Sequence, residues 1–212
     1  MAWPEIQAQK YIYFDENGNK INKSKFLKNW RDKDLLLSRW DSLGNDGKRY
    51  VRLKKDLYLK AKSDYNYINK ELEKLTNKSI PENTILLLNF NFKDDLCTSR
   101  WDNNWTKNDI QIRKHFLDPI KATIEKDSII YLVLFEKGMI VKNNTKRKNE
   151  YFFLDENSFF RKNIFKNPTL CGSFALIKPN GQTLIRNGEY RADDMVQHLI
   201  PENWNLFFGA ED

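Results

Sequence analysis

The chain has 212 residues, of which 40% are hydrophobic and 14% aromatic, and a formal net charge of +7. This size and composition exclude a disordered chain and predict a globular protein that builds its own core. No apolar run reaches the ~18 residues that a membrane-spanning helix needs, so we expect no transmembrane segment. No intact signal peptide is visible, although the segment before the first strand is compatible with a processed export signal. We therefore favour an exported protein slightly over a cytoplasmic one.

The first 80 residues predict a small α+β extension. Alternating β-rich residues indicate a strand at Tyr11–Phe14, and the Asn-Asp-Gly sequence at 45–47 is typical of a hairpin turn. Helices are expected at 25–30 and 63–75 from their apolar spacing and a serine cap. The polar segment 77–83, with its proline, breaks the chain. We place a domain boundary there, with residues 1–80 as the extension and 81–212 as the main domain.

The main domain begins with two strands around a helix. Continuous apolar runs at 84–92 and 128–135 predict buried strands of a sheet that is covered on both faces. Thr106 and Asp109 resemble a capping box at the start of the intervening helix. Apolar residues recur along that helix and predict its core-facing stripe: Ile112, Phe116, Ile120 and Ile124.

The last third of the chain carries the most readable pattern. An edge strand is expected at 151–153 and a helix at 157–165. A hairpin follows, with strands at 173–178 and 183–186 joined by a Pro-Asn-Gly turn, and then a final helix. We expect 84–92, 128–135 and both hairpin strands to share one mixed sheet flanked by helices, which makes the fold class α/β with an α+β extension.

This order of elements resembles the thioredoxin-like superfamily over roughly residues 81–204. In that superfamily the first strand leads into a Cys-x-x-Cys motif, and the matching segment here reads Cys97-Thr98-Ser99-Arg100. Arg100 therefore stands where the second cysteine would be. Gly172 occupies the position of the family's cis-proline, and Cys171 precedes it.

The resemblance implies that Cys171 faces Cys97, which leaves three interpretations of the only two cysteines. They are unrelated buried thiols, a structural disulfide, or a redox pair in which Cys97 attacks, Cys171 resolves and Arg100 lowers the thiol pKa. The missing second cysteine and the polar stretch before the helix argue against redox catalysis.

Other candidate site residues are few. Trp101 and Trp105 are expected either to form a binding surface beside the cysteines or to cap the sheet edge. Asp94 and Asp95 are interpreted as a solvated loop rather than as proton-transfer groups. Neither of the two histidines has neighbours at metal-ligand spacing, and no phosphate-binding glycine loop occurs, so we expect no metal and no cofactor.

Three functions follow from these observations. We favour a thioredoxin-like binding or accessory module with little or no classical oxidoreductase activity and a protein as its partner. The alternative is an atypical thiol–disulfide oxidoreductase that uses Cys97 and Cys171. The third is a basic protein that binds nucleic acid or an acidic protein. Nucleic acid is the less favoured partner, because the densest basic runs do not alternate with aromatic residues.

Overall fold

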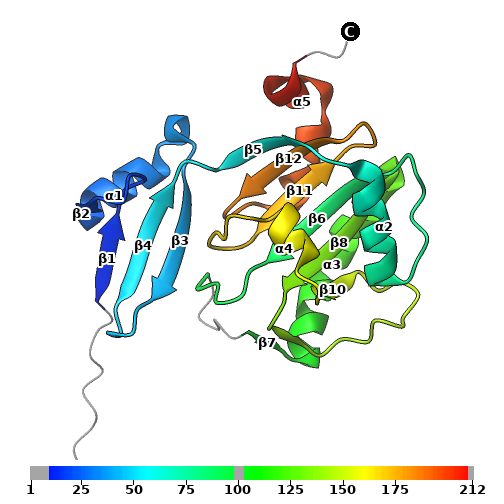
Figure 1. Cartoon of the computed structure of the whole chain (residues 1–212), viewed down its shortest axis with the longest axis horizontal. Coiled ribbons are helices and arrows are strands. Elements are labelled where there is room, and N and C mark those ends of the chain that lie inside the picture. Colours follow the sequence, from blue (N-terminus) through cyan, green and yellow to red (C-terminus); the bar gives the residue numbers. More distant parts are fainter. Residues whose placement is uncertain (1–9, 98–102, 210–212) are drawn as a thin grey trace, which may run out of the picture. The chain divides into compact units, whose positions relative to one another are not determined.

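The computed structural model describes residues 10–97 and 103–209, which form two compact units (Figure 1). Contacts divide the chain into an N-terminal unit, Met1–Leu57, and a C-terminal unit, Tyr58–Asp212. This division lies earlier in the chain than the boundary expected near residue 80. The reason is that the strand at Tyr58–Lys62 adds itself to the edge of the larger sheet, a pairing that no local sequence pattern reveals.

The N-terminal unit is a four-stranded sheet in the order β2-β1-β4-β3 with one helix. Its elements are β1 (Tyr11–Phe14), β2 (Lys20–Ile21), α1 (Lys23–Arg31), the 3₁₀ helix η1 (Lys33–Leu35), β3 (Ser38–Leu43) and β4 (Arg49–Lys54). The hairpin expected at residues 45–47 is confirmed, because β3 and β4 pair in antiparallel register on either side of it. The helix α1 begins at the cap Asn22, whose side chain accepts a hydrogen bond from the Lys25 amide.

The core of the N-terminal unit lies between α1 and one face of this sheet. Phe26 of α1 is fully buried against Leu37, Val51 and Leu53, and its ring centroid lies 5.1 Å from that of Tyr13. The side chains that neighbour these strand residues along the chain point to the opposite face of the sheet.

The C-terminal unit is a six-stranded mixed sheet in the order β10-β8-β6-β11-β12-β5. Its strands are β5 (Tyr58–Lys62), β6 (Ile85–Asn91), β8 (Ile129–Glu136), β10 (Phe152–Asp155), β11 (Ser173–Ile177) and β12 (Gln182–Asn187). A separate short pair is formed by β7 (Asn104–Trp105) and β9 (Ile140–Val141). The strands β10, β8 and β6 run parallel, and β11 is antiparallel to both β6 and β12. The four strands expected to share one sheet therefore do so, with the hairpin where the sequence placed it.

Helices cover both faces of this sheet (Figure 1). They are α2 (Tyr65–Thr76), α3 (Lys107–Ile124), α4 (Phe159–Asn163) and α5 (Pro201–Phe208), with the 3₁₀ helices η2 (Glu125–Asp127) and η3 (Ala192–Leu199). In Figure 1, α2 and α4 lie in front of the sheet, whereas α3 runs behind it. The rings of Tyr67 on α2 and Phe159 on α4 are in contact, with centroids 5.2 Å apart. None of the described helices has the length and apolar character required to cross a membrane.

The helix α3 corrects one sequence prediction. Its capping box at Thr106 and Asp109 is present, but the predicted core stripe is only partly buried. Ile112 and Phe116 are 61% and 55% exposed, whereas Ile110, Leu117 and Ile124 are buried. The buried residues are spaced seven apart, so they follow the seam that faces the sheet. Ile112 and Phe116 are four residues apart on a different face of the helix, so their side chains do not face the sheet.

A half-buried histidine near the end of η3 is expected to make the stability of the C-terminal unit depend on pH. His198 Nδ1 lies 3.1 Å from the Met195 carbonyl and Nε2 lies 3.3 Å from the Tyr58 hydroxyl. A carbonyl only accepts, so Nδ1 carries the proton and Nε2 accepts from the tyrosine. Burial lowers the pKa of His198, and the nearby Arg186 adds to this effect.

We therefore expect the unit to lose stability as the pH falls below about 6.5, the unperturbed histidine pKa. In that range the unfolded chain binds a proton that the folded unit resists. Thermal melting of the full chain between pH 7.5 and 5 would show this loss. In His198→Gln the decline should be smaller over the same range; equal declines would contradict the role of His198.

Candidate functional site at the disulfide

Cys97 and Cys171 are joined by a disulfide, with their Cα atoms 4.9 Å apart. Cys97 follows β6 and Cys171 precedes β11, so the bond links two loops at the same end of neighbouring strands. Cys97 is exposed and Cys171 is half-buried. The roles expected for Arg100 and Trp101 cannot be placed, since both residues lie outside the described residues.

Asp95 ties the two halves of this bond together. Its Oδ1 accepts hydrogen bonds from the amides of Cys97 at 2.9 Å and Cys171 at 3.1 Å. Its Oδ2 accepts from the amide of Gly172 at 3.0 Å. The carboxylate thus neutralises three amide dipoles that converge on the disulfide. The sequence interpretation of Asp95 as a solvated loop residue missed this role.

Among the residues that the structure describes, no helix begins next to Cys97. The helix α3 begins at Lys107, ten residues after Cys97. The positive end of a helix dipole acts within about one turn. A thiolate at this site would instead lie beside the carboxylate of Asp95, and a like charge nearby disfavours the thiolate form.

The loop before β11 has an unusual backbone. Cys171 and Gly172 both adopt positive φ, at 68° and 76°. A Cβ on Gly172 would lie 2.7 Å from the carbonyl oxygen of Phe90. The loop is held in this shape by Thr169, whose hydroxyl donates to the Gly172 carbonyl and accepts from the Gly188 amide. Glycine at 172 is therefore required both by conformation and by space.

Replacement of Gly172 by alanine is expected to destabilise the C-terminal unit by about 1–3 kcal/mol. Gly209→Ala is a useful comparison, because Gly209 also has positive φ but has no atom within 4 Å of a built Cβ. Urea unfolding of both variants separates the close approach to Phe90 from the backbone strain alone. A loss in Gly172→Ala no larger than that in Gly209→Ala would contradict the close-approach argument.

The loop after β6 is closed by a pair of polar side chains. Asn103 accepts from the Asp94 amide at 2.8 Å, and its amide group donates to the Asp94 carboxylate at 2.7 Å. The next residues form β7, where the half-buried Trp105 packs edge-on against Phe135 with ring centroids 5.0 Å apart. Trp105 thus contacts the edge of the sheet, and it also lines a cavity beside the disulfide.

This cavity has a volume of about 1020 Å³. Cys97, Cys171 and Asp95 line it, and so do the exposed α3 residues Ile112 and Phe116. The remaining apolar lining comes from Phe92, Trp105, Ile120, Met139 and Ala192. The volume lies at the upper end of the range for ligand cavities, about 300–1,000 Å³.

Polar groups from several elements also reach this cavity. Asn89 is buried in β6 and donates to the Tyr131 hydroxyl at 3.3 Å. Arg113 lies with its guanidinium carbon 5.5 Å from the Phe116 ring centroid. Tyr190 also lines the cavity, and burial raises the pKa of its hydroxyl. No sequence pattern singled out Asn89, Arg113 or Tyr190, because they come together only through the fold.

Among the described residues, no three His, Cys, Asp or Glu side chains gather in a way that would hold a metal ion. The functional groups at the site are therefore the Cys97–Cys171 disulfide, the Asp95 carboxylate with its three amide donors, and an apolar cavity lining with a few polar side chains.

No protein-family model matches the chain, and no curated protein matches it. Solved structures do resemble it. The exposed lipoprotein thioredoxin of Streptococcus pneumoniae shares 14% identity at a TM-score of 0.35, covering 76% of this chain and 98% of that one. The N-terminal domain of PilB from Neisseria gonorrhoeae shares 10% identity at a TM-score of 0.41, covering 66% and 97%. A secreted disulfide oxidoreductase of Mycobacterium tuberculosis shares 8% identity at a TM-score of 0.33, covering 59% and 90%.

Strands β6, β8, β11 and β12 share one mixed sheet, and β11 and β12 form an antiparallel hairpin, as the sequence resemblance implied. This mixed sheet with helices on both faces agrees with the thioredoxin-like fold that was expected. The TM-scores of 0.33 to 0.41 are too low for the solved structures to support more than this. The function of the C-terminal unit is therefore argued from the residues at its disulfide.

Proposed function

We propose that this protein is a thioredoxin-like binding module whose Cys97–Cys171 disulfide is structural. The observation that carries the proposal is the Asp95 carboxylate, which accepts the amides of both cysteines and of Gly172. A redox cysteine needs an environment that stabilises its thiolate. Here the converging amides are already occupied by a negative charge, and this favours the bonded form of the two cysteines.

The cavity beside the disulfide supplies the binding surface in this proposal. Ile112 and Phe116 are large apolar side chains that α3 leaves exposed at its edge. Exposed apolar groups next to a concave surface mark sites of protein interaction. The disulfide and the Asp95 bonds hold the part of the lining around Cys97 and Cys171 fixed, which reduces the entropy lost on binding. The partner is a protein segment that places apolar side chains against α3.

The proposed compartment follows from the same bond. Disulfides persist in oxidising environments and are rare in the cytosol. A structural role for the Cys97–Cys171 bond therefore supports export of the protein.

Binding is tested by selecting peptides from a displayed library on the full chain and measuring their affinity for two variants. Ile112→Lys should weaken the selected peptides about tenfold or more, because burial of one large aliphatic side chain contributes about 1.5–3 kcal/mol. Leu206→Lys is the matched control, since Leu206 is 80% exposed on α5 and is not part of the cavity lining. Equal effects of the two changes would contradict the assignment of the cavity.

Catalysis is tested by reduction of insulin disulfides with dithiothreitol as the electron source. We expect the wild type to match the Cys97→Ser/Cys171→Ser double variant, with neither exceeding the uncatalysed rate. Turnover by the wild type that disappears in the double variant would instead support the oxidoreductase alternative. The exposure of Cys97 makes this assay a fair test, because dithiothreitol can reach the bond to reduce it and an insulin disulfide can then reach the Cys97 thiol.

A further inference from the structure

A second, smaller cavity lies in the C-terminal unit, apart from the site at the disulfide. It has a volume of about 220 Å³ and shares no lining residue with the larger cavity. The segment after α2, the end of α3 with η2, the start of β8 and the loop before β10 form it. Three lysines line it: Lys78, Lys121 and Lys148. Its volume is below the range of about 300–1,000 Å³ for drug-sized ligands, so it suits a small ion or one functional group of a larger molecule.

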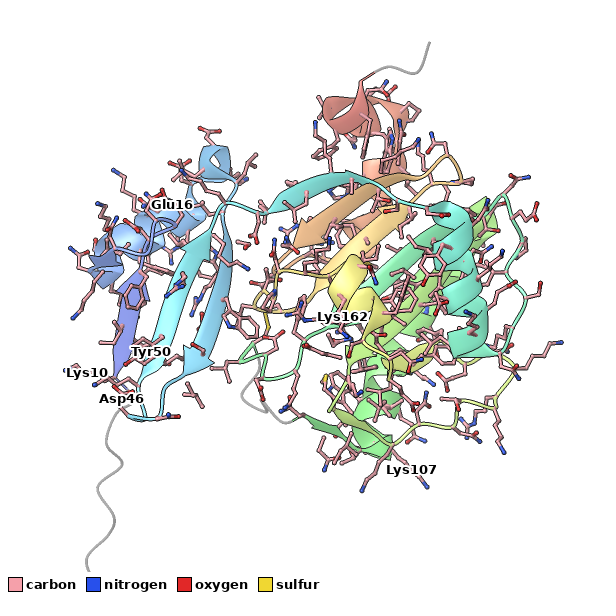
Figure 2. All side chains as sticks on the ribbon, in the orientation of Figure 1. Lys10, Glu16, Asp46, Tyr50, Lys107 and Lys162 are labelled. Atoms are coloured by element: carbon pink, nitrogen blue, oxygen red, sulfur yellow. A yellow bond between two sulfur atoms is a disulfide. The ribbon has the colours of Figure 1, made fainter. Side chains whose placement is uncertain are left out.

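Lys78 joins two segments of the chain at this cavity. Figure 2 shows the loop of residues 142–151 passing below the C-terminal end of α2. Lys78 follows the end of α2 by two residues, and its Nζ donates to the Glu150 carbonyl oxygen at 2.6 Å. The same Nζ lies 5.7 Å from the centroid of the Phe153 ring. Lys78 is half-buried, and both of these contacts are with uncharged groups.

The charges around Lys78 do not compensate its own charge. Lys114 pairs with Glu150, which makes one neutral pair. Lys121 pairs with Glu125, which makes a second. Lys78 itself has no carboxylate within salt-bridge distance among the described side chains. Burial lowers the pKa of Lys78, the two neighbouring ammonium groups lower it further, and the two carboxylates oppose them. An added negative charge would therefore stabilise this half-buried cation.

Three further side chains of the lining can donate hydrogen bonds to a ligand. Lys148 is exposed, as are Ser79 and Asn149. Within residues 10–97 and 103–209, none of these three side chains donates a hydrogen bond to another residue. Two ammonium groups, a hydroxyl and an amide thus line one small cavity. Charged and neutral donors that converge in this way are typical of sites for oxyanions.

We propose that this cavity binds a phosphate group. In this proposal Lys78 and Lys148 donate charge-assisted hydrogen bonds to the phosphate oxygens, and Ser79 and Asn149 donate neutral ones. A phosphate monoester carries a charge of about −1.5 to −2 at pH 7, which matches the two cations. A carboxylate has a single charge and two oxygens, so it would leave part of the donor set unused. The bound group ties the segment after α2 to the loop before β10.

The melting temperature of the full chain at neutral pH tests this binding, with inorganic phosphate raised at constant ionic strength. We expect a saturable rise, because a ligand that binds only the folded state stabilises it by mass action. Phosphate at 100 times its Kd should raise the melting temperature by about 5–10 °C. A general salt effect of phosphate acts through exclusion from the protein surface, and it would not saturate.

The same titration distinguishes the two sources of a phosphate group. O-phosphoserine represents a phosphorylated molecule, inorganic phosphate represents the free ion, and acetate represents a carboxylate. The phosphate compound with the lower Kd identifies the source. Either order supports the proposal, provided that acetate binds more weakly than both.

Matched variants locate the site. Lys148→Met should weaken phosphate binding about tenfold or more, as expected for the loss of one charge-assisted hydrogen bond. Lys146→Met removes an exposed cation from the same loop that does not line the cavity, and it should leave the Kd unchanged. Lys78→Met should abolish the saturable rise. Circular dichroism checks that each variant is folded.

Acylation of the wild type gives a readout that does not depend on the folding of a variant. A limiting amount of an amine-reactive ester modifies the lysines, and mass spectrometry measures the rate at each of them. Bound phosphate should slow the acylation of Lys78 several-fold. Lys70 is the control, since it is exposed on α2 and does not line the cavity. Its rate should not change.

Four results would overturn the proposal. The first is the absence of a saturable rise in melting temperature with either phosphate compound. The second is an equal loss of binding in Lys148→Met and Lys146→Met, which would mean that only net charge matters. The third is equal affinity for acetate and phosphate, which would indicate general attraction of anions. The fourth is an unchanged acylation rate of Lys78 at saturating phosphate, which would place the bound ion elsewhere.

Discussion

The double variant Cys97→Ser/Cys171→Ser is expected to unfold about 10 °C below the wild type. The disulfide spans a sequence separation of 74 residues, and the chain-entropy model gives a loop of this length about 4 kcal/mol of stability. At this size each 1 kcal/mol shifts the melting temperature by about 2–4 °C. Differential scanning calorimetry of the full chain measures the shift.

The reduced wild type serves as the control for this substitution. It should melt at the same temperature as the double variant in the presence of dithiothreitol, because both lack the same cross-link. A melting temperature unchanged by either treatment would contradict a structural role for the bond. In that case the hydrogen bonds of Asp95 and the backbone of Gly172 would fix the loop before β11 without help from the disulfide.

The second large effect is expected at Lys114, which pairs with a buried carboxylate in the C-terminal unit. Its Nζ lies 2.6 Å from both carboxylate oxygens of Glu150, and Glu150 is only 2% exposed. Burial on its own would raise the pKa of Glu150. The hydrogen bonds from Lys114 and from the amides of Tyr151 and Phe152 outweigh this effect and lower it.

Lys114→Met is therefore expected to cost about 3–5 kcal/mol, because it leaves Glu150 buried without its counter-charge. Lys121→Met on the same helix breaks a surface pair with Glu125 and should cost less than about 1 kcal/mol. Urea unfolding at pH 7 compares the two. The combination Lys114→Met/Glu150→Gln should recover part of the loss, since the neutral amide oxygen still accepts from the backbone amides. No recovery would indicate that packing rather than charge dominates.

The Lys114–Glu150 pair also predicts how the stability of the protein changes in acid. A carboxylate with a lowered folded pKa stabilises the protein above its unfolded pKa, and this contribution is lost as the pH falls through the folded value. The wild type should thus lose stability in acid from Glu150, in addition to the loss from His198. Lys114→Met should lose less of its remaining stability over that range.

Four strands of the C-terminal sheet could be predicted because their signals are local. The buried strand β6 is a continuous apolar run, and the hairpin of β11 and β12 is indicated by the turn sequence Pro179-Asn180-Gly181. Each of these patterns lies within about ten residues, where periodicity and turn chemistry are informative. The order of such elements was enough to suggest the fold.

The features that position the site depend on contacts between distant residues. Tyr58–Lys62 joins the sheet by pairing with β12, more than a hundred residues later. This pairing places the boundary between the two units before Tyr58 rather than near residue 80. Asp95 meets the Cys171 and Gly172 amides across 76 and 77 positions. The sequence suggested that Cys171 faces Cys97 only through family resemblance, and it offered no reason to connect Asp95 with either.

The exposed face of α3 shows a different limit. Ile112 and Phe116 fit a helical period as well as the buried residues do, so periodicity could not tell which row faces the sheet. Likewise, Lys78, Lys121 and Lys148 line one cavity only because the fold brings them together. Their spacing along the chain does not predict this cluster.

The most direct test of the structural role of the disulfide is its reduction potential. Equilibration of the full chain in glutathione and dithiothreitol buffers, followed by thiol alkylation, gives the midpoint for Cys97 and Cys171. We expect a value below about −300 mV, as for structural disulfides. Asp95→Asn should raise the midpoint, because it removes the charge that disfavours a thiolate, whereas Asp94→Asn should not. A wild-type midpoint between about −270 and −120 mV, the range of thiol–disulfide catalysts, together with no effect of Asp95→Asn, would contradict a structural role for the bond.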